Sequence, residues 1–468
     1  MTRRRLDLFW LALLVLYLIH AVAALRTERV LWGDGAYYML QILEDREFAL
    51  GDFSRSGADV LMELPLMASL RLGITDLDGL KLAFGLPPFL FAPLCMALCF
   101  WMAGPDKTAL CYPLATLAAG SMNTELLVIH ESRAALFLFW PILFGLLDPW
   151  RRSRTLWVSA LLSVPFMAAY ESAIALGPLL AFVAWERSRR ETSGGLRAGS
   201  SFCAAAAILA TLVALRSVIQ PTHPANFALF KQSWSVVSWD GGIGVHLSLA
   251  ILALAVLGAF GGTRLRDGLT LMAGVACVAG VWVSLSDPAH LAVESQYRAR
   301  ILNVILPALA SFALVFGPRL GVKIVLSRDV LGLLFVAQVA LQLQMTAQWS
   351  AFRQLTREQL GCVHGLIPVD TALAARLPER KLSSQWMRGW HHPALSFLDR
   401  AGALNAVLGV SNGYTSWQPF DARHADDLPR LSRYGVDDRG YRATIQRLTA
   451  NGGSTWEFAS CPTNGTGP

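Results

Sequence analysis

Asp34 lies between two glycines in the stretch Gly33-Asp34-Gly35, which aromatic and amide side chains follow. Asp is a favoured helix N-cap, and the residues from Asp34 to Glu47 have helical periodicity. The residues that then share the helix face of Asp34, at spacings of three, four and seven, are Tyr37, Tyr38 and Gln41. A carboxylate in this setting either acts as a general base toward a hydroxyl group or only caps the helix.

Further acidic residues lie beside apolar segments, namely Glu63, Glu125, Glu131 and Glu171. Glu131 and Arg133 stand at the mouth of an apolar segment, where they either pair locally or face a common cavity. Glu125, in the same loop, is the second candidate for an acid that faces this cavity. Glu171 separates two apolar segments, so it lies either at the surface or at a helical kink. Glu63 is near the start of a second amphipathic segment, Leu61–Leu72.

A later polar segment, residues 287–300, contains Tyr297, Arg298 and Arg300 immediately before an apolar stretch. Arginine binds phosphate oxygens bidentately, so these residues are candidates for a phosphate site. Contact with anionic lipid headgroups, or pairing with Glu294, is the alternative explanation.

The elements that must position these residues are membrane helices. The sequence is 54% hydrophobic and 16% charged, whereas soluble proteins carry about 25% charged residues. An apolar block of about 20 residues crosses the hydrocarbon layer as a helix. The expected fold class is therefore mainly α, a polytopic transmembrane bundle of about eleven spans. The expected spans lie near 8–25, 81–102, 109–121, 132–148, 155–170, 171–186, 200–220, 244–262, 268–286, 301–317 and 328–345.

Basic residues set the expected orientation of the bundle. Arg3, Arg4 and Arg5 precede the first apolar segment, which resembles an uncleaved signal anchor with its N-terminus in the cytoplasm. The alternating loops then contain most of the remaining Lys and Arg, as the positive-inside rule requires. The segments expected on the outer side are 26–80, 122–131, 221–243, 287–300 and the chain after 346. The short cytoplasmic loops account for most of the basic excess behind the net charge of +7, which argues against nucleic-acid binding.

Two domains are expected, a transmembrane module over 1–345, whose first outer loop is 26–80, and an extracytoplasmic domain over 346–468. In the second domain, helices are expected near 370–377, 394–408 and 440–450, with extended chain near 405–411. Five cysteines lie in or beside apolar segments as small core residues. Cys362 and Cys461 are disulfide candidates in an oxidising compartment. No motif for a metal site or for nucleotide binding is present.

The stretch from Gly33 to Leu40, just beyond the first span, resembles the first-loop motif of the GT-C superfamily of polyprenyl-phosphate-sugar-dependent integral membrane glycosyltransferases. The resemblance extends to the second loop helix, the many spans and the outer C-terminal domain. It implies transfer of a sugar from a lipid phosphate to an acceptor (a glycan, a lipid or a protein) in a bacterial inner (plasma) membrane. Asp34 would be the base or the residue that orients the acceptor, Glu131 the second acid, and the reaction would invert the anomeric carbon.

The chain has Gly33-Asp34-Gly35 where some members of the superfamily have paired acids, which argues against metal coordination there. Whether a divalent cation, Mg²⁺ or Mn²⁺, takes part stays open. Two other functions compete with sugar transfer. One is a transporter or flippase of lipid-linked sugars, and the other is an enzyme similar to O-antigen polymerases or ligases. A transporter is less favoured because no charge lies clearly in mid-span and no internal repeat is present.

Overall fold

The computed structural model describes the membrane module with short gaps and the C-terminal part in short segments. The described residues are 3–104, 107–122, 131–148, 153–221, 228, 243–260, 263–287, 296–321, 326–362, 365–368, 376–378, 380, 382, 386, 392–399, 402–403, 406–409, 431–434, 436–437 and 439. Helices make up most of this part of the chain, which confirms the mainly α fold class.

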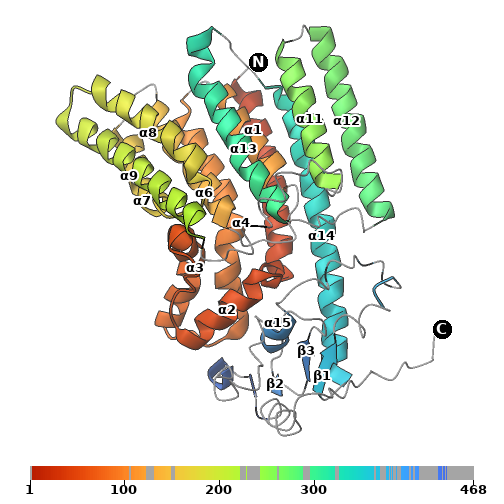
Figure 1. Ribbon diagram of the computed structural model, residues 1–468. Coiled ribbons are helices and arrows are strands. Elements are labelled where there is room, and N and C mark those ends of the chain that lie inside the picture. The colour runs from red at the N-terminus through yellow and green to blue at the C-terminus, as the bar shows by residue number, and fades with distance from the viewer. Residues whose placement is uncertain are drawn as a thin grey trace.

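The long helices form one elongated bundle (Figure 1). They are α1 (Arg3–Arg26), α4 (Leu77–Met102), α6 (Glu131–Leu147), α7 (Ser153–Phe166), α8 (Ala173–Arg190), α9 (Gly194–Ile219), α11 (Ile243–Phe260), α12 (Thr263–Ser286), α13 (Gln296–Phe316) and α14 (Arg328–Cys362). Among the described helices, five are long and apolar enough to cross a membrane: Leu8–Arg26, Leu77–Met102, Gly194–Ile219, Arg264–Ser286 and Arg328–Leu360. These five helices indicate that the chain is a membrane protein.

Helix α5 differs from the expected span at 109–121. It comprises six residues, Cys111–Thr116, and a π-helical turn of five residues, η4 (Leu117–Ser121), continues it. Together they are shorter than the roughly 20 residues that a membrane crossing requires. All of them are buried, so this segment packs inside the bundle instead of facing lipid.

One end of the bundle, called here the α2 end, contains the two short helices of the expected first loop (Figure 1). They are α2 (Asp34–Asp45) and α3 (Ser56–Arg71), with the 3₁₀ turns η1 (Arg29–Leu31) and η2 (Phe53–Arg55) before them. The predicted amphipathic character of α2 is confirmed, because Met39, Ile42 and Leu43 are buried. The expected N-cap role of Asp34 is wrong. Gly33 is the N-cap, at a φ of 67° that glycine tolerates, and Asp34 is the first helical residue.

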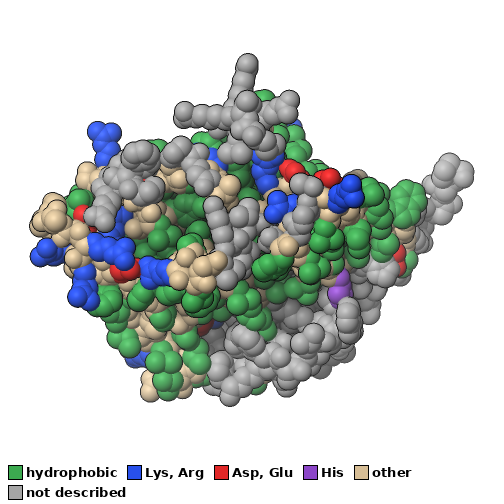
Figure 2. Space-filling model, turned by 90° about the horizontal axis from the view of Figure 1, so that it is seen from above, with side chains coloured by type: hydrophobic (Ala, Val, Ile, Leu, Met, Phe, Trp, Pro, Cys, Tyr) green, Lys and Arg blue, Asp and Glu red, His purple; other side chains and the backbone are tan. Residues whose placement is uncertain are grey.

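The opposite end of the bundle, seen in Figure 2, presents basic side chains around its rim. The exposed arginines there include Arg154, Arg189, Arg190, Arg197, Arg264, Arg266 and Arg319. They lie in the first turns of α7, α9 and α12, in the last turn of α8 and just after α13. The two ends of the bundle therefore differ in charge, as the sequence pattern predicts.

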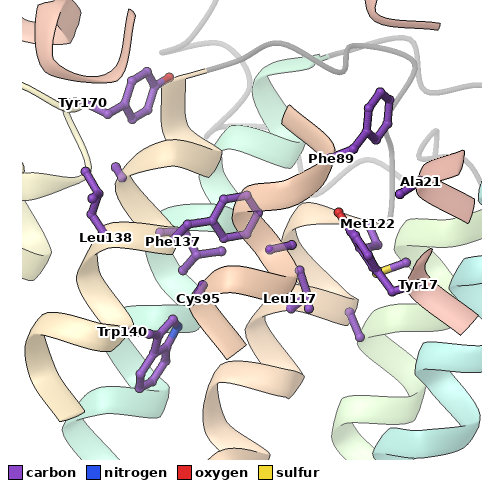
Figure 3. Packing of buried hydrophobic residues seen from close by; sticks show 14 of the residues in the cluster. Tyr17, Ala21, Phe89, Cys95, Leu117, Met122, Phe137, Leu138, Trp140 and Tyr170 are labelled. Atoms are coloured by element: carbon purple, nitrogen blue, oxygen red, sulfur yellow. The ribbon is translucent and has the colours of Figure 1, made fainter. Parts of the chain in front are cut away.

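The core of the bundle is apolar and closely packed. Figure 3 shows Tyr17 from α1, Phe89 from α4, and Phe137 and Trp140 from α6 among the side chains of this core. The Trp140 indole N–H donates to Thr116 Oγ1 at 2.8 Å. The five cysteines expected in the core are free and buried, which confirms that prediction: Cys95, Cys99, Cys111, Cys203 and Cys277. Cys362 ends α14, but its side chain and the whole of Cys461 lie outside the described residues, so the disulfide stays a prediction.

The C-terminal part packs against the α2 end. Helix α14 continues to Cys362, beyond the predicted span end at 345. Strand β1 (Gly365–Pro368) pairs in parallel with β3 (Ala406–Gly409), and α15 (His392–Leu398) lies between them in the chain. A second parallel pair joins β2 (Gly402–Ala403) to β4 (Val436–Asp437). Extended chain near 405–411 is thus confirmed at β3, whereas the expected helix over 394–408 is interrupted by β2 and β3.

Two kinds of contact fasten this part to the bundle. The Tyr434 hydroxyl donates to the Leu43 carbonyl of α2 at 2.8 Å. The Trp386 ring packs edge-on against Trp32, with ring centroids 5.8 Å apart, and its N–H donates to Gln348 Oε1 of α14. The C-terminal part therefore contacts the same short helix that begins at Asp34.

Candidate functional site

The carboxylates predicted as catalytic come together at the α2 end around Tyr38. Tyr38 is half-buried on α2, one helical turn after Asp34. Burial raises the pKa of the Tyr38 hydroxyl, and the neighbouring charges of Glu131, Asp34 and Asp59 raise it further. These three acids come from α6, α2 and α3, so the tertiary structure places their charges within electrostatic range of one side chain.

Arg55, in the turn before α3, joins the remaining predicted acid to this group. Its Nε and Nη2 atoms donate to Glu171 Oε1 at 3.1 and 2.8 Å, and its Nη1 lies 3.8 Å from Glu131 Oε1. Its guanidinium also lies over the Tyr170 ring, 5.3 Å from the centroid. Burial opposes the charge of Arg55, but Glu131 and Glu171 outweigh it and raise the pKa of Arg55 above its ordinary value.

A close backbone approach brings Arg55 to Glu171. The Gly57 N–H donates to the Ala168 carbonyl at 2.7 Å, and a Cβ atom at Gly57 would lie 2.1 Å from the Pro165 carbonyl oxygen. Only glycine allows α3 to begin so near the connection between α7 and α8. Glu171 lies in that connection, at the surface of the bundle, which is one of the two placements that the sequence predicts.

Asp59 and Glu63, four residues apart on α3, complete what is called here the carboxylate cluster: Asp34, Asp59, Glu63, Glu131 and Glu171. Of these, Glu131 and Glu171 contact Arg55. Burial, Glu131 and Glu63 raise the pKa of Asp59 to about 9, while Arg55 lowers it and Asp52 raises it slightly. Burial also raises the pKa of Glu63 to about 7, although Glu63 Oε2 accepts a hydrogen bond from the Ala49 N–H at 2.8 Å. Glu63 thus holds the segment between α2 and α3.

The raised pKa of Asp59 predicts a pH-dependent stability difference for Asp59→Asn. The folded protein holds a proton on Asp59 up to about pH 9, whereas the unfolded chain releases it near pH 4. Folding stability therefore falls as the pH rises between these values, and the neutral asparagine removes this loss. At pH 7 to 8 the variant is expected to be more stable by about 1–3 kcal/mol, and near pH 4 the two should be equal. Thermal unfolding in lipid nanodiscs over pH 4 to 9 measures the difference, and a pH-independent difference would contradict it.

A second group of polar side chains, called here the buried arginine pair, consists of Arg29 and Arg133. Arg29 is fully buried in η1, and its Nη1 donates to Gln342 Oε1 at 2.7 Å and to Thr346 Oγ1 at 3.2 Å. Gln342 in turn donates to the Met122 carbonyl at the end of the π turn η4. Arg133, 5% exposed, lies over the Phe137 ring at 5.9 Å.

Helix α1 presents two polar side chains to this pair. The guanidinium groups of Arg29 and Arg133 both lie within electrostatic range of His20 and of Tyr17. His20 Nδ1 and the Tyr17 hydroxyl are buried and make no hydrogen bond to any described residue. Buried polar atoms are nearly always hydrogen-bonded, so these two require a partner that the described chain does not provide.

An apolar cavity of about 290 Å³ begins at Tyr17. It lies between α1, α4, α5 and α14, and its lining includes Trp10, Met96, Phe100, Leu114 and Phe335. None of the acids of the carboxylate cluster lines it. Tyr17 therefore both lines the cavity and lies within electrostatic range of Arg29 and Arg133.

The other predicted residues divide into three groups. Tyr37 and Gln41 are half-buried on α2, and the Tyr37 and Tyr38 ring centroids lie 5.8 Å apart. Tyr297, Arg298 and Arg300 lie in the first turns of α13, but their side chains are outside the described residues. Asn303, one turn later, donates to Ser132 Oγ at 3.3 Å, so this part of α13 adjoins the start of α6. Glu125 is outside the described residues.

Sequence reasoning missed Arg29, Arg55 and Asp59. The signal for Asp59 was available, because Asp59 and Glu63 are spaced by one helical turn within a largely apolar helix. Arg29 follows Arg26 just beyond the first span, where a charged residue is ordinary and gives no signal of burial. Among the described residues, no group of three or more His, Cys, Asp or Glu side chains is arranged to hold a metal ion.

Comparison with known proteins does not assign the chain to a class. No protein-family model matches the sequence, and neither the curated proteins nor the solved structures give a match. The functional argument therefore depends on the residues and their geometry.

Proposed function

We propose that the protein is an integral membrane glycosyltransferase of the GT-C type, with about eleven spans. It transfers a sugar from a polyprenyl-phosphate donor to an acceptor on the outer side of the membrane. The observation that carries the proposal is the contact of Arg55 with Glu131 and Glu171, with Asp34 and Asp59 within electrostatic range of the neighbouring Tyr38, at the end of the bundle that also contains the buried arginine pair.

In the proposed reaction the carboxylate cluster and the buried arginine pair have different roles. Asp34 or Glu131 removes the proton from an acceptor hydroxyl as its oxygen attacks the anomeric carbon. The bond from that carbon to the phosphate oxygen breaks, and the lipid phosphate leaves with the electron pair. Arg29 and Arg133 stabilise the negative charge of the leaving phosphate. Attack opposite the leaving group inverts the anomeric carbon.

The apolar cavity supports a lipid-linked donor. Three of the helices that line it, α1, α4 and α14, contain segments long and apolar enough to cross a membrane. The lining includes Tyr17, which lies within electrostatic range of Arg29 and Arg133. Prenyl or acyl carbons bind in such a space by burial of apolar surface. The basic rim at the opposite end of the bundle supports a cytoplasmic orientation for that end.

A transport experiment separates the proposal from its main competitor, a flippase of lipid-linked sugars. The protein is reconstituted in vesicles with a radiolabelled polyprenyl-phosphate sugar and a mixed acceptor pool. Sugar transfer is expected, with release of the polyprenyl phosphate. Movement of the intact donor across the bilayer, without cleavage of the bond between sugar and phosphate, would instead show a flippase. Empty vesicles and a heat-inactivated sample are the controls.

A further inference from the structure

Tyr17 and His20 are polar side chains inside the first apolar helix, one helical turn apart on α1. Each is 3% exposed, and their rings meet edge-on with centroids 5.7 Å apart. Neither the Tyr17 hydroxyl nor His20 Nδ1 makes a hydrogen bond to any described residue. Buried polar atoms in an apolar segment are costly unless they are hydrogen-bonded, so the two neighbouring rings indicate a ligand.

The apolar cavity of about 290 Å³ lies directly beside this pair, because Tyr17 is part of its lining. On α1 the lining runs from Trp10 to Tyr17, a rise of roughly 10 Å, and it therefore extends from Tyr17 away from the α2 end. His20 lies on the other side of Tyr17, toward the α2 end. Figure 3 shows Tyr17 projecting from α1 into the packed core. The arrangement fits an amphipathic molecule, with a hydrocarbon chain in the cavity and a polar head at Tyr17 and His20.

The surroundings of the pair favour an anionic head. The Tyr17 ring lies 6.5 Å from that of Phe335 on α14, and Gln342, two helical turns further along α14, accepts from Arg29 Nη1 at 2.7 Å. Arg29 therefore lies beyond Tyr17 on the side opposite to the cavity. Arg29 and Arg133 are both within electrostatic range of Tyr17 and His20. Phosphate oxygens accept hydrogen bonds from guanidinium, hydroxyl and imidazole groups alike.

We propose that Tyr17 and His20 bind the phosphate group of a lipid phosphate whose single hydrocarbon chain occupies the apolar cavity. The inference rests on the proposed function for the role of this lipid as the sugar carrier. It deepens that function, because it assigns to two uncharged side chains of the first helix the selection of a phosphate head over a neutral one. The lipid phosphate then binds by itself, without an attached sugar.

The test measures binding in the absence of any sugar. Full-length protein in phosphatidylcholine nanodiscs is titrated with radiolabelled decaprenyl phosphate, and saturable binding is expected. The competitors are decaprenol, oleic acid, phosphatidylglycerol and inorganic phosphate. Decaprenol should compete at least about tenfold more weakly than unlabelled decaprenyl phosphate, because hydrogen bonds to a charged group are the stronger ones.

Three results of this titration would overturn the proposal. Absence of saturable binding would leave the two polar atoms to ordered water. Equal competition by decaprenol would show a site for the hydrocarbon chain alone. Competition by oleic acid, phosphatidylglycerol or inorganic phosphate at the concentration of decaprenyl phosphate would show a carboxylate, a membrane-lipid or a free-phosphate site.

Tyr17→Phe and Tyr112→Phe are matched variants, since each removes one hydroxyl group from a buried tyrosine and only Tyr17 lines the cavity. Tyr17→Phe is expected to weaken binding of decaprenyl phosphate about tenfold and to reduce the preference for decaprenyl phosphate over decaprenol. A merely structural role would not change that preference. His20→Leu should act in the same direction, and Tyr112→Phe should bind as the wild type does. Wild-type affinity in both Tyr17→Phe and His20→Leu, or an equal loss in Tyr112→Phe, would reject the assignment.

The failure of this site and the failure of the proposed function are distinguishable. Phosphate-selective binding without any sugar transfer in vesicles would refute the proposed function and leave the site intact. Sugar transfer by Tyr17→Phe and His20→Leu with the wild-type Michaelis constant for the donor would refute the site and leave the proposed function intact.

Discussion

Replacement of Asp34 by asparagine is expected to lower the rate of sugar transfer by about 100-fold or more, because a general base contributes about 10²- to 10⁴-fold to such reactions. Asparagine has the same shape as aspartate, and Asp34 is half-buried at the first turn of α2, so the fold should persist. The measurement is the initial rate of label transfer from a polyprenyl-phosphate sugar in vesicles, with thermal unfolding as the check on folding.

The control for this experiment is Asp45→Asn, which removes an exposed carboxylate at the other end of the same helix and should leave the rate unchanged. A wild-type rate for Asp34→Asn would remove Asp34 from the mechanism. In that case the transfer rate of Glu131→Gln decides whether Glu131 is the base, since the charges of both acids raise the pKa of the same Tyr38 side chain.

Replacement of Arg353 by methionine is expected to detach the C-terminal part from the bundle. Arg353 Nη2 lies 2.8 Å from Glu28 Oε2, and Arg353 also pairs with Asp399 just after α15. Glu28 additionally contacts Lys81 at 3.2 Å, and it has a left-handed backbone, with a φ of 51°. Arg353 is 5% exposed at its side chain and that of Asp399 is fully buried. Loss of one member of a buried ionic network costs about 3 kcal/mol or more.

Limited proteolysis measures this effect, as faster cleavage between α14 and α15 in the variant than in the wild type. The control is Arg357→Met, because Arg357 also contacts Asp399 at 3.1 Å but is 49% exposed. An exposed pair contributes about 0–1 kcal/mol, so cleavage of this control should stay near the wild-type rate. Equal protection of Arg353→Met would show that the Trp386 and Tyr434 contacts alone hold the C-terminal part.

Attachment of the C-terminal part has a consequence for the α2 end. Tyr434 donates to the carbonyl of Leu43, and the Trp386 ring contacts Trp32, two residues before Asp34. Both contacts therefore restrain the helix that begins at Asp34. The structure thereby connects the Arg353 network with the carboxylate cluster through α2.

Local sequence signals predicted the helices well where apolar residues are continuous. The residues of α4, α9 and α12 are long apolar runs, and a helix satisfies the backbone hydrogen bonds of such a run within the segment itself. The amphipathic α2 was also predictable, since its buried residues recur at helical spacing. The short α5 was not, because its interruption by a π turn depends on packing against Asn303 of α13 and Gln342 of α14.

By itself, the sequence determined that the chain is a helical membrane protein with an acidic residue at the start of α2 and basic residues at the opposite end. These features follow from composition and spacing, which act over one or two helical turns. Only the tertiary structure decided which acids meet. Arg55 joins Glu131 and Glu171 across 76 and 116 positions of sequence because Gly57 lets α3 approach the connection between α7 and α8, and no local pattern encodes that contact.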